Sequence, residues 1–354
     1  MFSISVVIPA RDSQDTIRVT IETLLNQTIR PDEVIVVVCP GDFTHTAIDD
    51  HISSGFVKVI SVKPPEDYLR DSQYKRWIGV QETKGDIIFL TDSRVWLEEH
   101  ALENAIRMMA VHNVDVVGGI TPAWPNQMKN FWAKLHDGAL VSNVPDFPMV
   151  GFLTKQNFGK TESLPVTTAL MMTRRVFEAV QSDFALEFSK IASTYDDYVL
   201  VWLISQAGFP ILVTNQVIAH HKHRTSWKGY SSQIARSGQS AAIMAKMYPT
   251  CPFGIRRVKQ VSMITVGFFL SVVIGIITIA VFGWLAVTAG LLLSMLAGLV
   301  LGMINVVKAK GEVKAFIFPV FTALLILNFS LHFGKTYIRT EHRPQQMLSY
   351  LQIH

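Results

Sequence analysis

A stretch of 47 residues without a charged side chain, from Val261 to Val307, is the feature that most constrains how this chain can fold. A helix needs only about 20 apolar residues to cross a bilayer, so the stretch is long enough for two crossings. Gly283 and Trp284 form the predicted turn, because glycine relaxes the backbone and tryptophan favours the membrane interface. The predicted spans are residues 261–282 and 285–307.

A third apolar segment, residues 315–334, is also long enough to span, although Pro319, Asn328 and His332 interrupt it. The loop before it, residues 308–314, carries three lysines, and positive loops face the cytoplasm. Two crossings before this loop place the N-terminal part of the chain on the same side. A third crossing would put the positive residues that follow it outside. The segment is therefore predicted either to span, to be re-entrant or to lie at the interface.

The charge and the cysteines exclude some classes of protein. The net charge is +4, but the basic residues gather beside the apolar segments and not among stacking aromatics, so no nucleic acid is expected as a partner. Two cysteines, Cys39 and Cys251, make no disulfide framework. The N-terminus has no leader pattern and runs directly into an apolar strand-like run. We expect a multi-pass protein of the cell membrane whose N-terminal domain faces the cytoplasm.

The first 225 residues alternate β-type runs with helical patterns. Strands are predicted at 4–8, 33–38, 57–62, 86–91 and 115–119, and helices at 15–27, 68–83 and 99–111. Short apolar strands separated by helices predict an α/β, Rossmann-like fold with a mainly parallel sheet and helices on both faces. Ligands bind such sheets at the carboxyl ends of the strands, where residues 9–12, 39–42 and 92–94 should meet.

These patterns divide the chain into four predicted regions. They are a catalytic domain at 1–225, a juxtamembrane helical segment at 226–258, a transmembrane region at 259–337 and a polar tail at 338–354.

The first predicted strand ends in the run VVIPARD at residues 6–12, and a helical pattern follows. The run resembles the opening of the family 2 glycosyltransferases, whose glycosyltransferase A fold begins with a VVIP-type strand. The resemblance implies that the nucleotide-sugar donor contacts Pro9, Ala10, Arg11 and Asp12. The alternative is an ordinary strand end.

The run GDIIFLTDSR at residues 85–94 resembles the strand that leads into the DxD motif of this family. A carboxylate at a strand end can bind a divalent cation, Mg²⁺ or Mn²⁺, that bridges the donor diphosphate. Asp92 is the predicted ligand, although it could instead only cap the following turn. The second acidic position is Arg94, which can itself neutralise phosphate charge. Ser93 and Arg76, the latter from the preceding helical pattern, complete this part of the predicted donor site.

Two further runs, TTALMM at 167–172 and YDDYVL at 195–200, resemble the acceptor side of the same family. The second run corresponds to the family's Glu-Asp helix start, with Asp196 in place of Glu. The resemblance implies that Asp197 is the catalytic base and that Asp196 lies beside it. An acidic pair at a helix start can also serve as an N-terminal cap, but one acid is enough for that.

The run HHKHRTSW at residues 220–227, followed by Arg236, resembles the family stretch that closes the donor site. His221 is expected to bind the cation or the diphosphate, and His223, Arg224 and Arg236 to add positive charge near the leaving group. The alternative is a basic juxtamembrane patch that contacts anionic lipid.

One region departs from the family pattern. After the second strand the family usually has Asp-Asp or Asp-Asn with Gly-Ser, and an acid there contacts the nucleobase, whereas residues 38–41 read VCPG. Asp42 is the candidate substitute, and the nucleotide stays open.

The apolar segments predict membrane anchoring, and the family resemblance implies an inverting glycosyltransferase. The expected partners are a nucleotide sugar, a lipid-linked acceptor such as a polyprenyl phosphate, and membrane lipids, and a homo-oligomer is left open. The alternative is a non-catalytic, transferase-like membrane protein that regulates glycan assembly. A transporter is less favoured, because apolar segments without a buried charge pair make a poor pathway.

Overall fold

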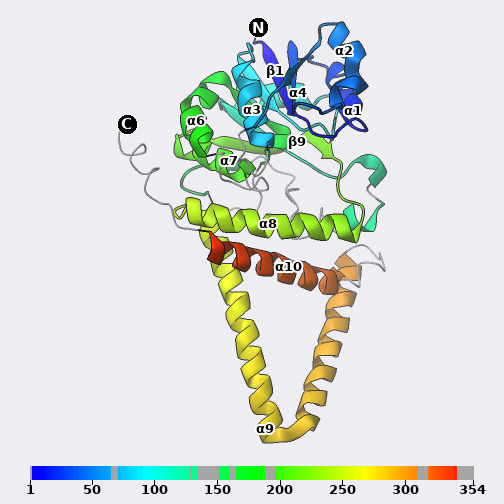
Figure 1. Cartoon of the computed structure of the whole chain (residues 1–354), viewed down its shortest axis with the longest axis vertical. Coiled ribbons are helices and arrows are strands. Elements are labelled where there is room, and N and C mark those ends of the chain that lie inside the picture. The colour runs from blue at the N-terminus through cyan, green and yellow to red at the C-terminus, as the bar shows by residue number, and fades with distance from the viewer. Residues whose placement is uncertain are drawn as a thin grey trace. The chain divides into compact units, whose positions relative to one another are not determined.

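The structure is a computed structural model that describes residues 2–64, 71–127, 129–133, 151–158, 165–187, 196–308 and 318–340. Its internal contacts divide the chain into two compact units, Met1–Thr225 and Ser226–His354. Figure 1 labels helices of both units and, in the first unit, the strands β1 and β9.

The first unit is built on one mixed sheet. Its strands are β1 (Ile4–Pro9), β2 (Glu33–Val38), β3 (Val57–Ser61), β4 (Ile87–Leu90), β5 (Val95–Leu97), β6 (Val116–Ile120), β7 (Gly151–Leu153), β8 (Leu170–Thr173) and β9 (Ile211–His221). Their order is β3-β2-β1-β4-β8-β6-β9-β5, with β7 also paired to β9. The five predicted strands are confirmed as β1, β2, β3, β4 and β6.

The sheet was expected to be mainly parallel, and parallel pairing is found in its first half. Strands β3, β2, β1 and β4 run parallel. Strand β8 then lies antiparallel between β4 and β6, and β9 pairs parallel with β6 but antiparallel with β5 and β7. The second half is therefore mixed, because β8 enters the sheet in the opposite direction to both of its neighbours.

Helices cover the sheet of the first unit. They are α1 (Ile17–Leu25), α2 (Asp49–Ser53), α3 (Ser72–Gln81), α4 (Ala101–His112), α6 (Arg174–Glu187) and α7 (Asp196–Gln206), with short 3-10 turns at Thr44–Ile48, Pro125–Gln127 and Thr167–Ala169. The three predicted helices are confirmed as α1, α3 and α4, although residues 68–70 of the predicted segment 68–83 lie outside the described residues.

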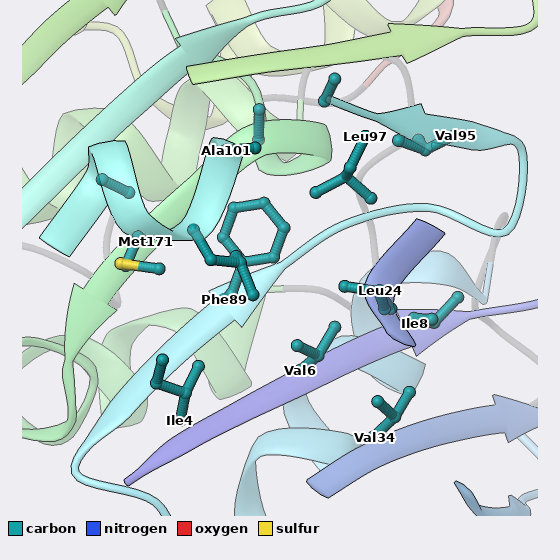
Figure 2. Packing of buried hydrophobic residues seen from close by; sticks show 14 of the residues in the cluster. Ile4, Val6, Ile8, Leu24, Val34, Phe89, Val95, Leu97, Ala101 and Met171 are labelled. Carbon is teal, nitrogen blue, oxygen red and sulfur yellow. The ribbon is translucent and has the colours of Figure 1, made fainter. Parts of the chain in front are cut away.

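The core forms around β1, which is buried along its whole length. Figure 2 shows Val6 of this strand between Val34 of β2 and Phe89 of β4, which are its register partners on the two sides. Leu24 of α1 packs in the same cluster. A strand covered on both faces needs apolar residues at successive positions, which explains why β1 is apolar at nearly every position.

The second unit contains three long helices, α8 (Trp227–Met247), α9 (Pro252–Lys308) and α10 (Phe318–Arg339). Helix α9 is interrupted at Gly283, whose φ of 68° and ψ of −172° are not helical, and it doubles back there (Figure 1). The predicted turn at Gly283 is thereby confirmed. Among the described residues, Pro252–Leu285 is the helix long and apolar enough to cross a membrane, and Thr288–Ile304 is a shorter apolar helix.

Helix α10 lies along α8 in this unit (Figure 1). Asn328 donates to the Ser231 carbonyl at 2.8 Å, and the Lys246 ammonium lies 4.3 Å from the centre of the Tyr337 ring. A side chain at Gly238 would overlap the backbone of α10 at Phe329, so glycine allows the two helices to approach closely. The opposite side of α10 carries an exposed apolar stripe. Its members are Val320, Leu324, Leu327 and Leu331.

Candidate active site

Two carboxylates from distant parts of the chain meet on one arginine. Asp92 follows β4, Asp197 lies in the first turn of α7, and Arg76 projects from α3. The Arg76 guanidinium contacts Asp92 Oδ1 through Nη2 at 2.5 Å and Asp197 Oδ1 through Nη1 at 3.6 Å. The Arg76 side chain is 5% exposed, whereas those of Asp92 and Asp197 are 25% and 20% exposed. The carboxylates are therefore reachable from solvent, and the guanidinium lies beneath them.

The packing of α3 on the sheet explains why Arg76 reaches this position. A side chain at Gly79 would overlap Val7 of β1 and lie 3.1 Å from a methyl group of Val37 in β2, so the helix backbone lies directly on the sheet. Residues three apart share a helix face. Gln73 and Arg76 therefore lie on the same buried face as Gly79, further towards the carboxyl ends of the parallel strands.

Asp92 is held as a charged group. Thr168 donates to its Oδ2 at 2.8 Å, opposite the oxygen that Arg76 occupies. Burial alone would raise the pKa of Asp92, but Arg76, His221 and the Thr168 hydroxyl outweigh it and hold the pKa below its ordinary value. Asp92 is consequently ionised at neutral pH.

Asp197 is held differently. It accepts a short hydrogen bond from the Thr167 hydroxyl and another from Gln73 Nε2 at 3.3 Å. Burial raises the pKa of Asp197 and the negative charge of Asp92 adds to the rise, while Arg76 opposes it. A raised pKa makes this carboxylate the better proton acceptor of the two. Of Asp196, the structure describes only the backbone, at the start of α7.

Hydrogen bonds connect the loop after β1 to the loop after β2. Asp42 is 8% exposed, and its Oδ2 accepts from the Asp12 amide at 3.1 Å while Oδ1 accepts from the Thr44 amide and hydroxyl at 2.8 and 2.6 Å. Asp12 has a φ of 47°, a conformation that this hydrogen bond supports. The carboxylate of Asp42 is therefore engaged within the protein. The Ser93 hydroxyl, 2.8 Å from that of Ser13, ties the loop after β4 to the loop after β1.

A second polar group lies beneath Ala10 and was missed by sequence reasoning. Lys75 is 1% exposed, and its ammonium donates to the Ala10 carbonyl at 2.6 Å and lies 2.8 Å from Asp71. The Cys39 thiol donates to the same carboxylate at 3.0 Å, and Arg11 lies 4.0 Å from it. The signal that could have identified this group is the spacing of Asp71 and Lys75, which are four residues apart at the start of α3.

Gln73, Thr167 and Thr168 were likewise not predicted as partners of Asp92 and Asp197.

The histidine run divides into residues with different surroundings. His220 contacts the Ala123 carbonyl at 2.8 Å and Glu98 at 3.1 Å, which fixes it within the sheet. His221 acts electrostatically on Asp92, and its Nδ1 lies 3.5 Å from that of His223. The predicted residues Asp92, His221 and His223 are thus brought together.

The three other predicted cations, Arg94, Arg224 and Arg236, differ in burial and in the part of the chain that carries them. Arg94 is half-buried, and its carbonyl accepts from the Lys222 amide at 3.0 Å, which connects the end of β4 to the end of β9. The cation paired with Asp92 is Arg76 and not Arg94. Arg224 is exposed, and Arg236 belongs to α8 in the second unit, so its role at the donor site stays a prediction.

The fit of a divalent cation can be tested on these side chains. Among the residues that the structure describes, no group of three His, Cys, Asp or Glu side chains could hold a metal ion. Asp92 and the neighbouring His221 offer one carboxylate and one imidazole. Magnesium-type sites often use one or two carboxylates and take their other ligands from substrate phosphates and water. The donor set therefore fits a cation that binds together with a diphosphate.

Comparisons with known proteins agree with this architecture. Residues 3–240 match the model of the family described as Glycosyltransferase like family 2. A search of curated proteins found no match. The structure of the mannosyltransferase PcManGT from Pyrobaculum calidifontis, in complex with GDP-Man and Mn²⁺, matches with a TM-score of 0.60 and 15% identity, covering 96% of this chain and 88% of that chain.

Two structures of S. aureus TarS also match. The first has a TM-score of 0.47 and 14% identity, and the match covers 69% of this chain and 42% of the TarS chain. The second, TarS 1–349 in complex with UDP-GlcNAc, has the same TM-score and identity and covers 69% of this chain and 66% of that chain. The chain thus spans less than half of the longer TarS chain.

Proposed function

The chain belongs to the glycosyltransferase family 2, and from this premise we propose that it transfers a sugar from a nucleotide-sugar donor, with inversion, to a lipid-linked acceptor at a membrane. The observation that carries the proposal is the pair of carboxylates on Arg76, one ionised and one with a raised pKa. In such a pair, the ionised carboxylate can bind a cation that neutralises the donor diphosphate, and the carboxylate with the raised pKa can accept the proton of the acceptor.

On the donor side, the proposed contacts are the predicted residues at the carboxyl ends of β1 and β4. The mannosyltransferase PcManGT, which shares the fold, was solved with GDP-Man and Mn²⁺, which supports a nucleotide sugar and a cation for this chain also. Asp92 and His221 would hold the cation, which neutralises charge on the departing diphosphate. Asp42 contributes by bracing the loop at Asp12, because its oxygens are already occupied.

On the acceptor side, the proposed reaction is a displacement at the anomeric carbon. The acceptor oxygen forms the new bond as the bond to the diphosphate oxygen breaks, and the nucleoside diphosphate leaves with the electron pair. Where the acceptor is a hydroxyl, its proton passes to Asp197, which Thr167 and Gln73 hold in place. A polyprenyl phosphate is already ionised and needs no base.

Membrane anchoring is supported by the second unit. The helix Pro252–Leu285 is apolar, and its most apolar window is not buried by other parts of the chain. The exposed stripe on α10 and the packing of its other face on α8 support the interfacial alternative for residues 315–334. We further propose that the loop 308–314, most of which lies outside the described residues, faces the same side as the catalytic domain. A lipid-linked acceptor gives the enzyme a reason to be at the bilayer.

The rival interpretation, a non-catalytic regulator, rests on Arg94 in place of the second acid. The paired carboxylates and the family membership favour an enzyme.

The decisive experiment uses the full-length protein in nanodiscs with a panel of nucleotide sugars and polyprenyl phosphate. Release of nucleoside diphosphate is followed, and the lipid product is identified by mass spectrometry. We expect release with one donor, dependent on the lipid. Release that is unchanged when the lipid is left out would contradict the lipid-linked acceptor, and no release with any donor would contradict transfer.

Topology is tested separately by cysteine labelling. Cys39 and Cys251 are first replaced by serine, and single cysteines are then placed in the loop 308–314. Labelling from the side of the catalytic domain is expected, and labelling only from the opposite side would overturn the topology.

A further inference from the structure

We propose that Arg76 is a positioning residue that competes with the divalent cation for Asp92, so that the cation binds tightly only together with the donor diphosphate. The inference rests on the proposed function, because it concerns the same site. Arg76 was predicted to contact the donor. In this proposal it is instead the resident counter-ion of Asp92.

The first step is that Arg76 is confined. Its side chain is 5% exposed, and α3 is fixed against the sheet by the close approach at Gly79. A guanidinium is planar, always charged and presents its nitrogens in a rigid fork. It can therefore serve two carboxylates at once from one buried position, which a flexible surface cation could not do.

The second step is that both oxygens of Asp92 already have partners. Arg76 occupies Oδ1 at 2.5 Å, and the Thr168 hydroxyl occupies Oδ2 at 2.8 Å. A divalent cation that binds Asp92 must displace one partner or share an oxygen with it. Sharing with the guanidinium brings like charges together in a site that is only a quarter exposed, where repulsion is weakly screened.

The third step is that Arg76 has a second place to bind. Its Nη1 lies 3.6 Å from Asp197 Oδ1, which is within ion-pair distance but longer than the contact to Asp92. When a cation takes Asp92, the guanidinium can tighten on Asp197 without leaving its buried position. Binding of the cation and donor at Asp92 would then strengthen the contact between Arg76 and Asp197 that orients the Asp197 carboxylate.

The donor is expected to relieve the competition. A diphosphate supplies oxygen ligands to the cation and negative charge that offsets the repulsion from Arg76. Cation and diphosphate should therefore bind cooperatively, and by linkage each raises the affinity of the other by the same factor.

The test measures Mn²⁺ binding by electron paramagnetic resonance on the full-length protein, without and with UDP. In Arg76→Gln we expect the affinity for Mn²⁺ alone to rise by about tenfold, because the variant removes a positive charge beside the carboxylate that would bind the cation. The gain in affinity that UDP brings should shrink accordingly. Arg175→Gln is the matched control, since Arg175 is 70% exposed and pairs with Asp115, which directly precedes β6. It should bind Mn²⁺ like the parent protein.

An affinity for Mn²⁺ alone that is unchanged or weaker in Arg76→Gln, with circular dichroism unchanged, would overturn the proposal. So would a variant that loses affinity for UDP without Mn²⁺, because Arg76 would then be a donor contact. If Arg76→Gln does not fold, Arg76→Lys decides. A single ammonium cannot serve both carboxylates, so Mn²⁺ affinity should rise by a smaller factor, and no change would sink the idea.

These readouts separate the inference from the proposed function. A protein that shows the competition but transfers no sugar would disprove the function and leave the role of Arg76 standing. A protein that transfers sugar but binds no Mn²⁺, with or without UDP, would disprove the competition alone.

Discussion

The end of β4 and the start of α7 each present one carboxylate to Arg76, yet the two regions treat their carboxylates in opposite ways. At the end of β4, charge partners outweigh burial and the pKa of Asp92 is lowered. At the start of α7, burial and the neighbouring negative charge outweigh Arg76, and the pKa of Asp197 is raised. The guanidinium contact is 2.5 Å on one side and 3.6 Å on the other.

This difference shows how one guanidinium, that of Arg76, can contact two carboxylates that have different roles. The shorter contact and the nearby His221 stabilise the charge of Asp92, which suits a group that holds a cation. The longer contact leaves Asp197 easier to protonate, which suits a base. The adjacent residues Thr167 and Thr168 follow the same division, because each donates to a different carboxylate.

Cation removal should have the largest effect and tests the role given to the end of β4. EDTA is expected to abolish turnover, and Mn²⁺ or Mg²⁺ to restore it, measured as nucleoside diphosphate release. Full activity in EDTA, together with a large loss in Arg94→Ala, would instead show that the arginine carries the charge of the leaving group.

Asp92→Ala should reduce kcat by about 10³-fold, because it removes the cation ligand and leaves Arg76 without its closer partner. Asp86→Asn is the matched control, since Asp86 lies just before the same strand and bonds to Ser3. The control should keep its activity. A loss in the control as large as that in Asp92→Ala would attribute both effects to the strand and not to the site.

Asp197→Asn should reduce kcat with a hydroxyl acceptor by about 10²-fold while donor affinity survives, because only the proton acceptor is lost. Donor affinity is measured by titration calorimetry beside the turnover assay. Unchanged turnover would point to an acceptor that is already ionised. A variant that does not fold would favour the alternative in which Asp197 only caps α7.

The sequence was sufficient for the strands and helices in the first half of the first unit. For the site, it suggested Asp92, Asp197 and Arg76 as candidates but not their partners Gln73, Thr167 and Thr168. Strands β1 and β2 have six residues each, most of them apolar, which the sequence pattern detects directly. Strands β5, β7 and β8 have only three, three and four residues, too few for a period to be visible. Their antiparallel pairing was consequently missed, and the sheet was expected to be more parallel than it is.

The meeting of Asp92 and Asp197 on Arg76 could not be read from the sequence. It depends on how closely α3 approaches β1, which Gly79 decides, and on the place of α7 beside the short turn at Thr167 and Thr168. The spacing of Gln73, Arg76 and Gly79 at intervals of three residues was the available signal. It indicates a shared face but not what that face contacts.

The two carboxylates should also differ in their contribution to stability, and this effect is smaller. Asp92→Asn breaks a largely buried ion pair and should lower the free energy of unfolding by about 3 kcal/mol. Asp197→Asn removes a charge that burial disfavours, so the loss should be under about 1 kcal/mol. The apparent Tm of the full-length variants ranks the two, and a larger loss in Asp197→Asn would reverse the comparison.

The pH dependence of the free energy of unfolding has the sign expected if Asp92 stabilises the fold as a charged group and Asp197 does not. The lowered pKa of Asp92 gives stability that is present above its unfolded value, about 3.9, and is lost as pH falls through the folded pKa. The raised pKa of Asp197 gives stability that is lost as pH rises through its folded value.

The smallest expected effect is a displacement of the pKa of Asp197 when its neighbour changes. Because the negative charge of Asp92 helps to raise this pKa, Asp92→Asn should lower it, and Arg76, released from its closer partner, should lower it further. The pKa is read from the carboxyl ¹³C shift of labelled aspartate, with Asp197→Asn used to assign the signal, so the test does not depend on residual turnover. In the parent enzyme with a hydroxyl acceptor, kcat should fall as pH falls through the same pKa, since the base must be deprotonated. An unchanged or higher pKa in Asp92→Asn would show that the two carboxylates do not influence each other through Arg76, and the contrast between the two regions would then rest on burial alone.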